Sequence, residues 1–202
     1  MFARTLADDA ELRPLEPWQA AEFAEHADRV RKDIDYYIPW ARTVVDEASA
    51  REFLQTYALK LAKDQGRIYG IWVDGVLQGG TVFRTFDAAM GVCEAGVWLA
   101  EGARGRGLIT TAVRYMIDWA FVARGMHRVE WLCDPRNTAS AAIAERLGMT
   151  CEGVLRQGFV LGGDRRDVQV WSILADDWQP TEHQPTEHQP TERQSTERQP
   201  TR

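Results

Sequence analysis

Hydrophobic and polar positions along the chain follow two different periods, which predict a domain that mixes helices and strands. Apolar side chains recur three and four positions apart in four segments, which predict amphipathic helices over residues 17–31, 46–64, 108–124 and 138–147. Apolar runs and alternation rich in β-forming residues predict strands over residues 11–15, 67–73, 76–86, 92–100, 127–133, 152–161 and 167–174.

Turn residues separate several of these elements. Asp74 and Gly75 lie between two predicted strands and are the strongest hairpin signal in the chain. A second hairpin is expected to turn at residues 162–164, which read Gly-Gly-Asp. Pro17 suits the first turn of the first helix.

The last 24 residues differ from the rest of the chain. Residues 179–202 repeat the units QPTEH, QPTER and QSTER and carry no aliphatic or aromatic side chain to bury. Such a segment cannot offset its ordering entropy, so we expect a disordered tail. Residues 1–178 are long enough for one domain with an adequate core, and we expect a single α/β domain there.

Charge and cysteine content narrow the class of protein. The formal net charge is −6, and the one basic cluster is too local for a nucleic-acid footprint. Cys93, Cys133 and Cys151 lack metal-ligand spacing, so we expect reduced, buried thiols and no metal site. The sequence shows neither a signal segment nor an apolar run long enough to span a membrane, and we expect a soluble, cytoplasmic protein.

A glycine-rich basic loop precedes the third predicted helix. Residues 104–112 read Arg-Gly-Arg-Gly-Leu-Ile-Thr-Thr-Ala and follow the strand that ends near Leu99. Gly105 and Gly107 allow a sharp turn that exposes consecutive N–H groups, and the helix that starts near Leu108 adds the positive end of its dipole. The loop therefore favours an anion such as a diphosphate. The glycine spacing differs from the Gly-x-Gly-x-x-Gly of dinucleotide-binding folds. It also differs from the phosphate loop of nucleotide triphosphatases, because no Lys-Ser/Thr pair follows the last glycine.

A second motif follows about thirty residues later. The predicted strand at residues 127–133 ends at Asp134-Pro-Arg, and Asn137 precedes a helix that Gly148 ends. Asn137 is expected at the helix N-terminus, where capping is its ordinary role, and Ser140 in the first turn, where it often bonds the backbone.

In this order the motifs resemble those of the GNAT acyl-CoA N-acyltransferases, and among them the RimJ/RimL-like branch. Arg104-x-x-Gly107 is similar to the start of the pyrophosphate loop of that superfamily, and Asn137-x-x-Ser140 is similar to its Asn-x-x-Ser helix. The stretch Ile38-Pro39-Trp40 and two late strands also match, so the resemblance covers roughly residues 9–178. It implies the GNAT fold, a mostly antiparallel sheet that splays after its fourth strand and is flanked by helices.

The resemblance implies a cofactor and a set of residues that bind it. The cofactor is acetyl-CoA or another short acyl-CoA, such as succinyl-CoA. The implied binding residues are Trp98, Leu99, Arg104, Gly105, Arg106, Gly107, Leu108, Ile109, Asn137 and Ser140. Two positions depart from the family pattern. Ile109 replaces a glycine or alanine of the loop and is expected to restrict the approach of the backbone to phosphate, while Ala144 excludes the tyrosine acid that many members carry there.

Glu94 and Ser140 are the expected catalytic residues. A carboxylate at a partly desolvated strand can accept the proton of an ammonium group, and the hydroxyl of Ser140 can protonate the leaving thiolate, as the branch is proposed to do. Each also has a structural alternative: a salt bridge or strand-end carboxylate for Glu94, and a backbone hydrogen bond for Ser140.

The sequence indicates less about the acceptor substrate than about the cofactor. Tyr36, Tyr37 and Trp40 are expected to line the substrate site together with Glu94, although packing in the core also explains these aromatics. The expected substrate is a primary amine on a peptide, a protein or a small molecule. Alternatives are a non-catalytic acyl-CoA-binding module, a succinyl-CoA-using transferase and, against the acidic charge, an RNA-associated protein. No nucleic-acid or membrane partner is expected, and a homodimer is plausible for the branch.

Overall fold

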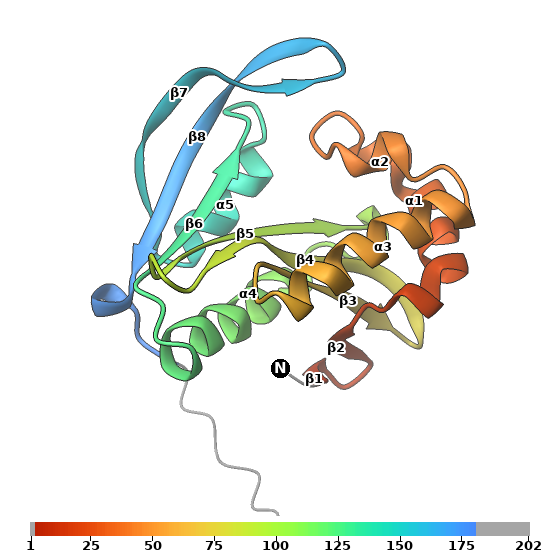
Figure 1. Cartoon of the computed structure of the whole chain (residues 1–202), viewed down its shortest axis with the longest axis horizontal. Helices are drawn as coiled ribbons and strands as arrows, with labels where there is room; N and C mark the ends of the chain where they lie inside the picture. Colours follow the sequence, from red (N-terminus) through yellow and green to blue (C-terminus); the bar gives the residue numbers. More distant parts are fainter. Residues whose placement is uncertain (1–2, 181–202) are drawn as a thin grey trace, which may run out of the picture.

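A computed structural model describes residues 3–180 of the 202-residue chain. Eight strands form one sheet in the order β1-β2-β3-β4-β5-β6-β8-β7, and all neighbours are antiparallel except β5 and β6 (Figure 1). The strands are β1 (Arg4–Ala7), β2 (Ala10–Pro14), β3 (Arg67–Val73), β4 (Val76–Asp87), β5 (Val92–Leu99), β6 (Arg128–Cys133), β7 (Thr150–Leu161) and β8 (Asp164–Leu174). This mixed, mostly antiparallel sheet confirms the expected fold class.

Helices cover both faces of the sheet and enclose two separate cores (Figure 1). The helices are α1 (Ala20–Ile34), α2 (Trp40–Thr43), α3 (Glu47–Ala62), α4 (Leu108–Asp118) and α5 (Thr138–Arg146). The first three pack on one face around Phe23, Leu54 and Trp72, all buried. The other two pack on the opposite face, where Met116 and Ile117 are fully buried. The sheet is therefore packed against helices on both of its faces.

Capping residues set the ends of some helices. Asp46 caps α3 by accepting the backbone N–H of Ser49 at 2.8 Å, which satisfies one of the four free donors at a helix start. At its far end α4 continues into a π-helical turn, Trp119–Ala123, so the predicted helix over 108–124 is correct in extent but not in its last turn.

Two details differ from the sequence prediction. Strand β1 was not predicted, because it has only four residues, all exposed or half-buried, and such a strand lacks a clear alternation of apolar and polar positions. Cys151 is exposed rather than buried, because β7 is the edge strand of the sheet and most of it faces solvent, whereas Cys93 and Cys133 are buried as expected. All three thiols are free.

The parallel pair β5 and β6 separates partway along its length. Register pairs run from Val92 with Arg128 to Ala95 with Trp131, and beyond that point the two strands diverge. Figure 1 shows β5 and β6 as the two arms of a wedge. This is the splay that the family resemblance implied, and it opens the sheet where the predicted site residues converge.

The described residues do not include most of the predicted C-terminal tail, since residues 181–202 lie outside them, as do residues 1 and 2. The division into a domain over 1–178 and a tail over 179–202 therefore stays a prediction. Within residues 3–180, no helix has the length and apolar character that crossing a membrane requires.

Candidate active site

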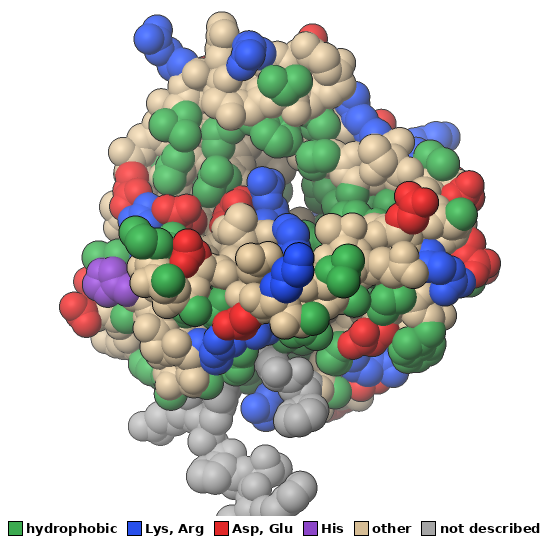
Figure 2. Space-filling model, in the orientation of Figure 1, with side chains coloured by type: hydrophobic (Ala, Val, Ile, Leu, Met, Phe, Trp, Pro, Cys, Tyr) green, Lys and Arg blue, Asp and Glu red, His purple; other side chains and the backbone are tan. Residues whose placement is uncertain are grey.

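Two cavities meet in the wedge between β5 and β6. One, of about 590 Å³, runs along the start of α4 and is called the donor cleft below. The other, of about 300 Å³, lies between the first helices and the β7–β8 hairpin and is called the acceptor cavity. Figure 2 shows a hollow there with hydrophobic side chains on both sides. The residues shared by both cavities form a neck: Tyr37, Ile38, Val97, Trp98, Asn137 and Ser140.

The glycine loop forms one end of the donor cleft. Gly105 and Gly107 have φ values of 79° and 75°, in the left-handed region that favours glycine. No heavy atom lies within 4 Å of a Cβ built on either glycine, so the backbone borders open space. Gly107 is the N-cap of α4 and provides no side-chain cap, so the first-turn N–H groups, which include that of Leu108, stay open. This cradle fits a phosphate.

The two arginines of the loop point to different places. Arg104 lines the donor cleft and makes no ion pair with any described residue. The side chain of Arg106 instead pairs with Asp9 at 2.5 Å, next to the β1–β2 turn, and is absent from the cleft wall. Asp9 therefore holds the charged side chain of Arg106 away from the cleft wall, and binding of the cofactor at this position, which its backbone N–H could still provide, stays a prediction.

Ile109 belongs to both the core and the donor cleft. Its side chain is 7 % exposed and packs in the core cluster, and the residue also lines the donor cleft. Its expected place among the cofactor-binding residues and its expected effect on the approach of phosphate stay predictions.

Trp98 forms a fixed wall of the neck. Its indole N–H donates to Nε2 of His26 at 3.0 Å, and its ring packs against Trp40 with centroids 5.4 Å apart. His26 is fully buried, and burial with the nearby Arg29 lowers its pKa to about 4, so it stays neutral and accepts this hydrogen bond. Leu99, the next residue, lines the donor cleft as expected.

Asn137 and Ser140 lie at the start of α5, on the other side of the neck. The side-chain oxygen of Asn137 accepts the backbone N–H of Ser140 at 3.1 Å, so the capping role expected from the sequence is present. The hydroxyl oxygen of Ser140 accepts the indole N–H of Trp131 at 2.9 Å. This bond occupies one lone pair of the oxygen and does not use the hydroxyl hydrogen, for which the thiol of Cys133 is a neighbouring partner.

Glu94 lines the acceptor cavity just below the splay. Its carboxylate is 8 % exposed and lies 3.2 Å from Nε of Arg84, measured from Oε1. Burial raises the pKa of Glu94, Arg84 lowers it, Glu130 on the neighbouring strand raises it, and Lys60 on α3 lowers it. The net direction is upward, as a carboxylate that takes up a proton near neutral pH requires.

Two of the three aromatic residues expected at the substrate site line the acceptor cavity, and the third does not. Tyr37 and Trp40 line the acceptor cavity. Tyr36 is not among the lining residues, and its ring lies 5.2 Å and 4.2 Å from the guanidinium carbons of Arg136 and Arg166. Its expected place in the substrate site stays a prediction that the cavity lining does not support.

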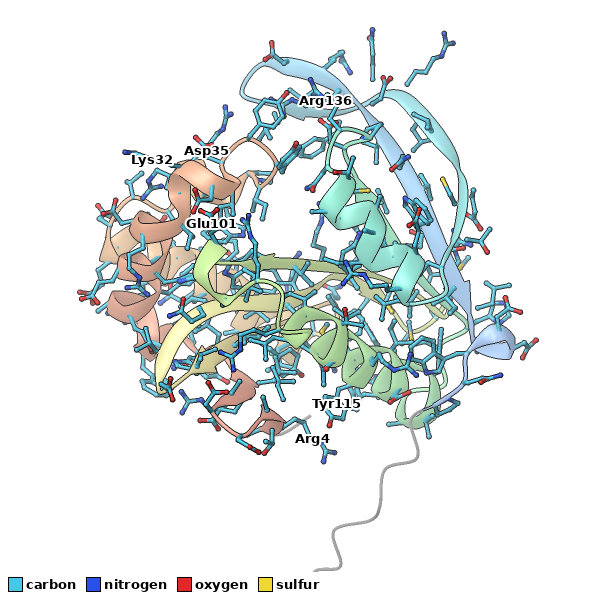
Figure 3. The ribbon with its side chains drawn as sticks, turned by 180° about the vertical axis from the view of Figure 1, so that it is seen from behind. Arg4, Lys32, Asp35, Glu101, Tyr115 and Arg136 are labelled. Carbon is cyan, nitrogen blue, oxygen red and sulfur yellow. The ribbon has the colours of Figure 1, made fainter. Side chains whose placement is uncertain are left out.

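Contacts of Tyr36 and Tyr37 connect the end of α1 to the segment after β6 and to β8. The hydroxyl of Tyr37, after α1, donates to the carbonyl of Arg136, after β6, at 3.3 Å. Figure 3 shows Arg136 across the opening from Asp35 and Lys32, which mark the end of α1. The hydrogen bond therefore joins a residue of the neck, Tyr37, to a residue of the donor cleft, Arg136.

Sequence reasoning missed many residues that line the acceptor cavity, among them Tyr57, Arg84, Asp134 and Arg166. Only Arg84 left a signal, as a charged residue inside an otherwise apolar run of strand. Metal ligation has no support in residues 3–180, where no three His, Cys, Asp or Glu side chains form a group that could hold an ion.

The comparisons with known proteins agree with this geometry. Residues 10–150 match the family model described as an acetyltransferase (GNAT) domain. The chain is 31% identical over 179 residues to the probable N-acetyltransferase YjcK of Bacillus subtilis (strain 168), covering 82% of this chain and 94% of that protein. It is 25% identical over 137 residues to the ribosomal-protein-serine acetyltransferase of Escherichia coli (strain K12), covering 68% and 76%.

Among solved structures, a RimL ribosomal L7/L12 α-N-protein acetyltransferase in complex with coenzyme A superimposes with a TM-score of 0.81. Its sequence identity is 20%, and the match covers 87% of this chain and 99% of that one. This likeness supports the fold, and the family model supports the class of enzyme. The chain belongs to the GNAT acetyltransferase family and is an N-acetyltransferase.

Proposed function

We propose that this protein transfers an acetyl group from acetyl-CoA to a primary amine by direct attack, without a covalent acyl-enzyme. One observation carries the proposal. The splay past Ala95 and Trp131 joins a phosphate-sized cradle at one end to a buried carboxylate at the other through a single neck. A donor and an acceptor that enter from opposite sides meet in that neck, which brings the reacting atoms together.

The donor side is assigned to the loop and the start of α4. The open N–H groups near Gly105 and Gly107, together with Arg104, would hold the diphosphate. Leu99 and Trp98 on β5 and Asn137 on α5 would flank the pantetheine arm as it passes into the neck. When bound, acetyl-CoA supplies an activated acyl group whose thioester carbon the amine attacks.

Glu94 is proposed as the general base. An amine arrives largely protonated at neutral pH, and only the neutral form attacks a carbonyl carbon. A buried carboxylate with an elevated pKa accepts that proton well, directly or through one water molecule. Arg84 keeps the carboxylate ionised enough to act, since its guanidinium opposes the effect of burial.

Ser140 is proposed as the general acid. This residue lines the neck, and the indole of Trp131 donates to its hydroxyl oxygen. The hydroxyl hydrogen would pass to the departing thiolate while the oxygen takes up the proton that the attacking nitrogen loses, so the serine ends the step neutral. The absence of a tyrosine at position 144 does not remove the acid, because buried Ala144 belongs to the core and Ser140 occupies the neck.

The acceptor is proposed to be the amino group of a peptide or protein, in line with the relative that acetylates ribosomal-protein serine. Tyr37 and Trp40 would wall the path to Glu94. Small-molecule amines are the alternative acceptors, and the thiol-release assay described below includes them. A cytoplasmic location and dimer formation stay predictions from the sequence.

The test is release of free thiol from acetyl-CoA with a panel of peptide and small-molecule amines, for the wild type and for Glu94→Gln. We expect the variant to bind acetyl-CoA in calorimetric titration as the wild type does, and to lose turnover most at neutral and lower pH. Equal turnover would remove Glu94 from the mechanism. Titration with succinyl-CoA in parallel identifies the preferred acyl group. Cofactor binding without thiol release for any amine would favour the non-catalytic alternative.

A further inference from the structure

Arg84 owes its position to a β-bulge. In the antiparallel pair of β4 and β5, Phe83 faces Ala95 and Thr85 faces Glu94, so Arg84 is the extra residue between them. A bulge turns a side chain away from the regular alternation and is frequent next to active sites. Nζ of Lys60 on α3 donates to the carbonyl of Arg84 at 2.8 Å, which fixes the bulge.

The stem of Arg84 lies across β5 at Gly96. A Cβ built on Gly96 would lie 3.2 Å from Cγ2 of Val82, which is a tight contact, and 3.8 Å from Cδ of Arg84, which is an ordinary van der Waals distance. Gly96 stands between Glu94 and Trp98 on the same face of the strand. The Arg84 stem therefore passes over this glycine, and its guanidinium lies in the acceptor cavity beside the carboxylate of Glu94.

Only some of the hydrogen-bond donors of the Arg84 guanidinium have a partner among residues 3–180. Its Nε contacts Glu94, whereas Nη1 and Nη2 make no hydrogen bond with any residue from 3 to 180, and the side chain is 48 % exposed. The hydroxyl of Tyr57 lines the same cavity and also lacks a hydrogen-bond partner among those residues. Burial raises the pKa of Tyr57 to about 12, so the hydroxyl keeps its proton and remains a donor.

The other arginine of the acceptor cavity, Arg166, is already engaged. It donates to the carbonyl of Tyr36 and lies 3.9 Å from the carboxylate of Asp134, which Arg136 also binds. Among the described residues that line this cavity, Arg84 is therefore the cation with open donors. Those donors stand next to the carboxylate that would receive the amino group.

We infer that Arg84 is the residue that selects the acceptor: its guanidinium binds a carboxylate carried by the substrate close to the amino group that is acetylated. Tyr57 supplies a further hydrogen bond to the same carboxylate. The inference rests on the proposed function. Arginine suits this task because its planar donors match the two oxygens of a carboxylate. The carboxylate comes either from the side chain of an acidic amino-terminal residue or from the α-carboxyl of a free amino acid.

The experiment compares matched acceptors that differ only in the carboxylate. Asp-Phe-amide is paired with Asn-Phe-amide, Glu-Phe-amide with Gln-Phe-amide, and phenylalanine with phenylalaninamide. The measured quantity is the ratio of kcat/KM for the acid to that for its neutral partner, because any general effect of a variant on Glu94 cancels in the ratio. We expect a ratio of at least about ten for the wild type in one of these pairs, the size of one hydrogen bond to a charged group.

Three variants assign the preference to Arg84. Arg84→Gln should bring the ratio to about one, and Arg84→Lys should keep part of it, because the charge remains and the paired donors do not. Arg51→Gln is the matched control. Arg51 is also half-exposed and bound to a glutamate, Glu47, but it lies on the surface of α3, so its loss should leave the ratio unchanged.

Each outcome of this experiment either supports or overturns the role of Arg84 in acceptor selection. Ratios near one in the wild type, with acetylation intact, would overturn the role of Arg84 and leave the proposed function standing. A ratio that Arg84→Gln does not change would also overturn it. Efficient use of succinyl-CoA by the wild type and not by Arg84→Gln, without an acceptor preference, would assign the guanidinium to the donor instead. No acetylation of any acceptor would remove the proposed function and this inference together.

Discussion

An alanine at position 105 separates the two roles that the structure gives to the glycine loop. Gly105 has φ of 79° and borders open space in the donor cleft. Gly75, in the β3–β4 hairpin, has φ of 77°, equally open surroundings and no place in either cavity. The substitutions Gly105→Ala and Gly75→Ala therefore impose the same backbone strain, but only the first places a methyl group where a phosphate is proposed to bind.

The expected magnitudes follow from this geometry. A left-handed conformation costs an alanine roughly 1–2 kcal/mol, and no neighbouring atom adds a clash at either position. For a domain of this size, each variant should lower Tm by roughly 2–8 °C. Losing even one charge-assisted hydrogen bond to phosphate costs about 1.5–3 kcal/mol, so Gly105→Ala should weaken acetyl-CoA binding by at least about tenfold.

Thermal unfolding and calorimetric titration with acetyl-CoA give the two quantities. We expect both variants to lose similar stability and Gly105→Ala alone to lose affinity. Equal acetyl-CoA affinities for the two variants would refute the assignment of the cradle to the diphosphate. A much larger loss of stability at position 105 than at position 75 would refute the claim that the loop borders open space.

Three further outcomes are expected. Arg104→Ala should weaken acetyl-CoA binding several-fold in the same titration, whereas Arg106→Ala should change it little, and equal losses would contradict the separate directions of the two side chains. Ser140→Ala should lower turnover without weakening cofactor binding, and it should cost about 1–3 kcal/mol of stability in urea unfolding because the indole N–H of Trp131 loses its acceptor; unchanged turnover would point to water as the acid. Two arginines lower the pKa of Asp64 to about 2, chiefly through hydrogen bonds from Arg124, so its stabilising effect is present above pH of about 4 and is lost as the pH falls toward 2. The stability advantage of the wild type over Asp64→Asn should therefore shrink across that range, and a constant difference would contradict the ion pair.

The sequence predicted the elements that carry strong local signals. The hairpin at Asp74-Gly75, the cradle glycines and the helix that Asn137 starts all appear where turn and cap chemistry places them. These positions are legible because left-handed backbone and free helix donors each favour particular residues. The splay itself left no such mark, because the periodicity of the two strands does not show where their pairing ends, at Ala95 and Trp131.

Side-chain direction was the main thing that the sequence could not supply. Arg104 and Arg106 have the same chemistry two positions apart, yet Asp9, almost one hundred residues away in the chain, draws the second out of the cleft. Tyr36 and Tyr37 are adjacent in the sequence but have different surroundings. The ring of Tyr36 packs against the guanidinium groups of Arg136, after β6, and Arg166, on β8, whereas Tyr37 lines the neck. Partners distant in the sequence decide such directions, so a local motif predicts the backbone of a site better than its side chains.

The bulge at Arg84 shows why this limit matters for substrate choice. The loop and the start of α5 act through backbone N–H groups and a helix cap, which short motifs specify. The acceptor cavity instead depends on one extra residue in β4, a flat position at Gly96 and a lysine from α3, contributed by three separate elements. None of these is a motif on its own. Proteins that share the donor motifs can therefore differ in the amine they accept, and the residues around the bulge are where such differences should be sought.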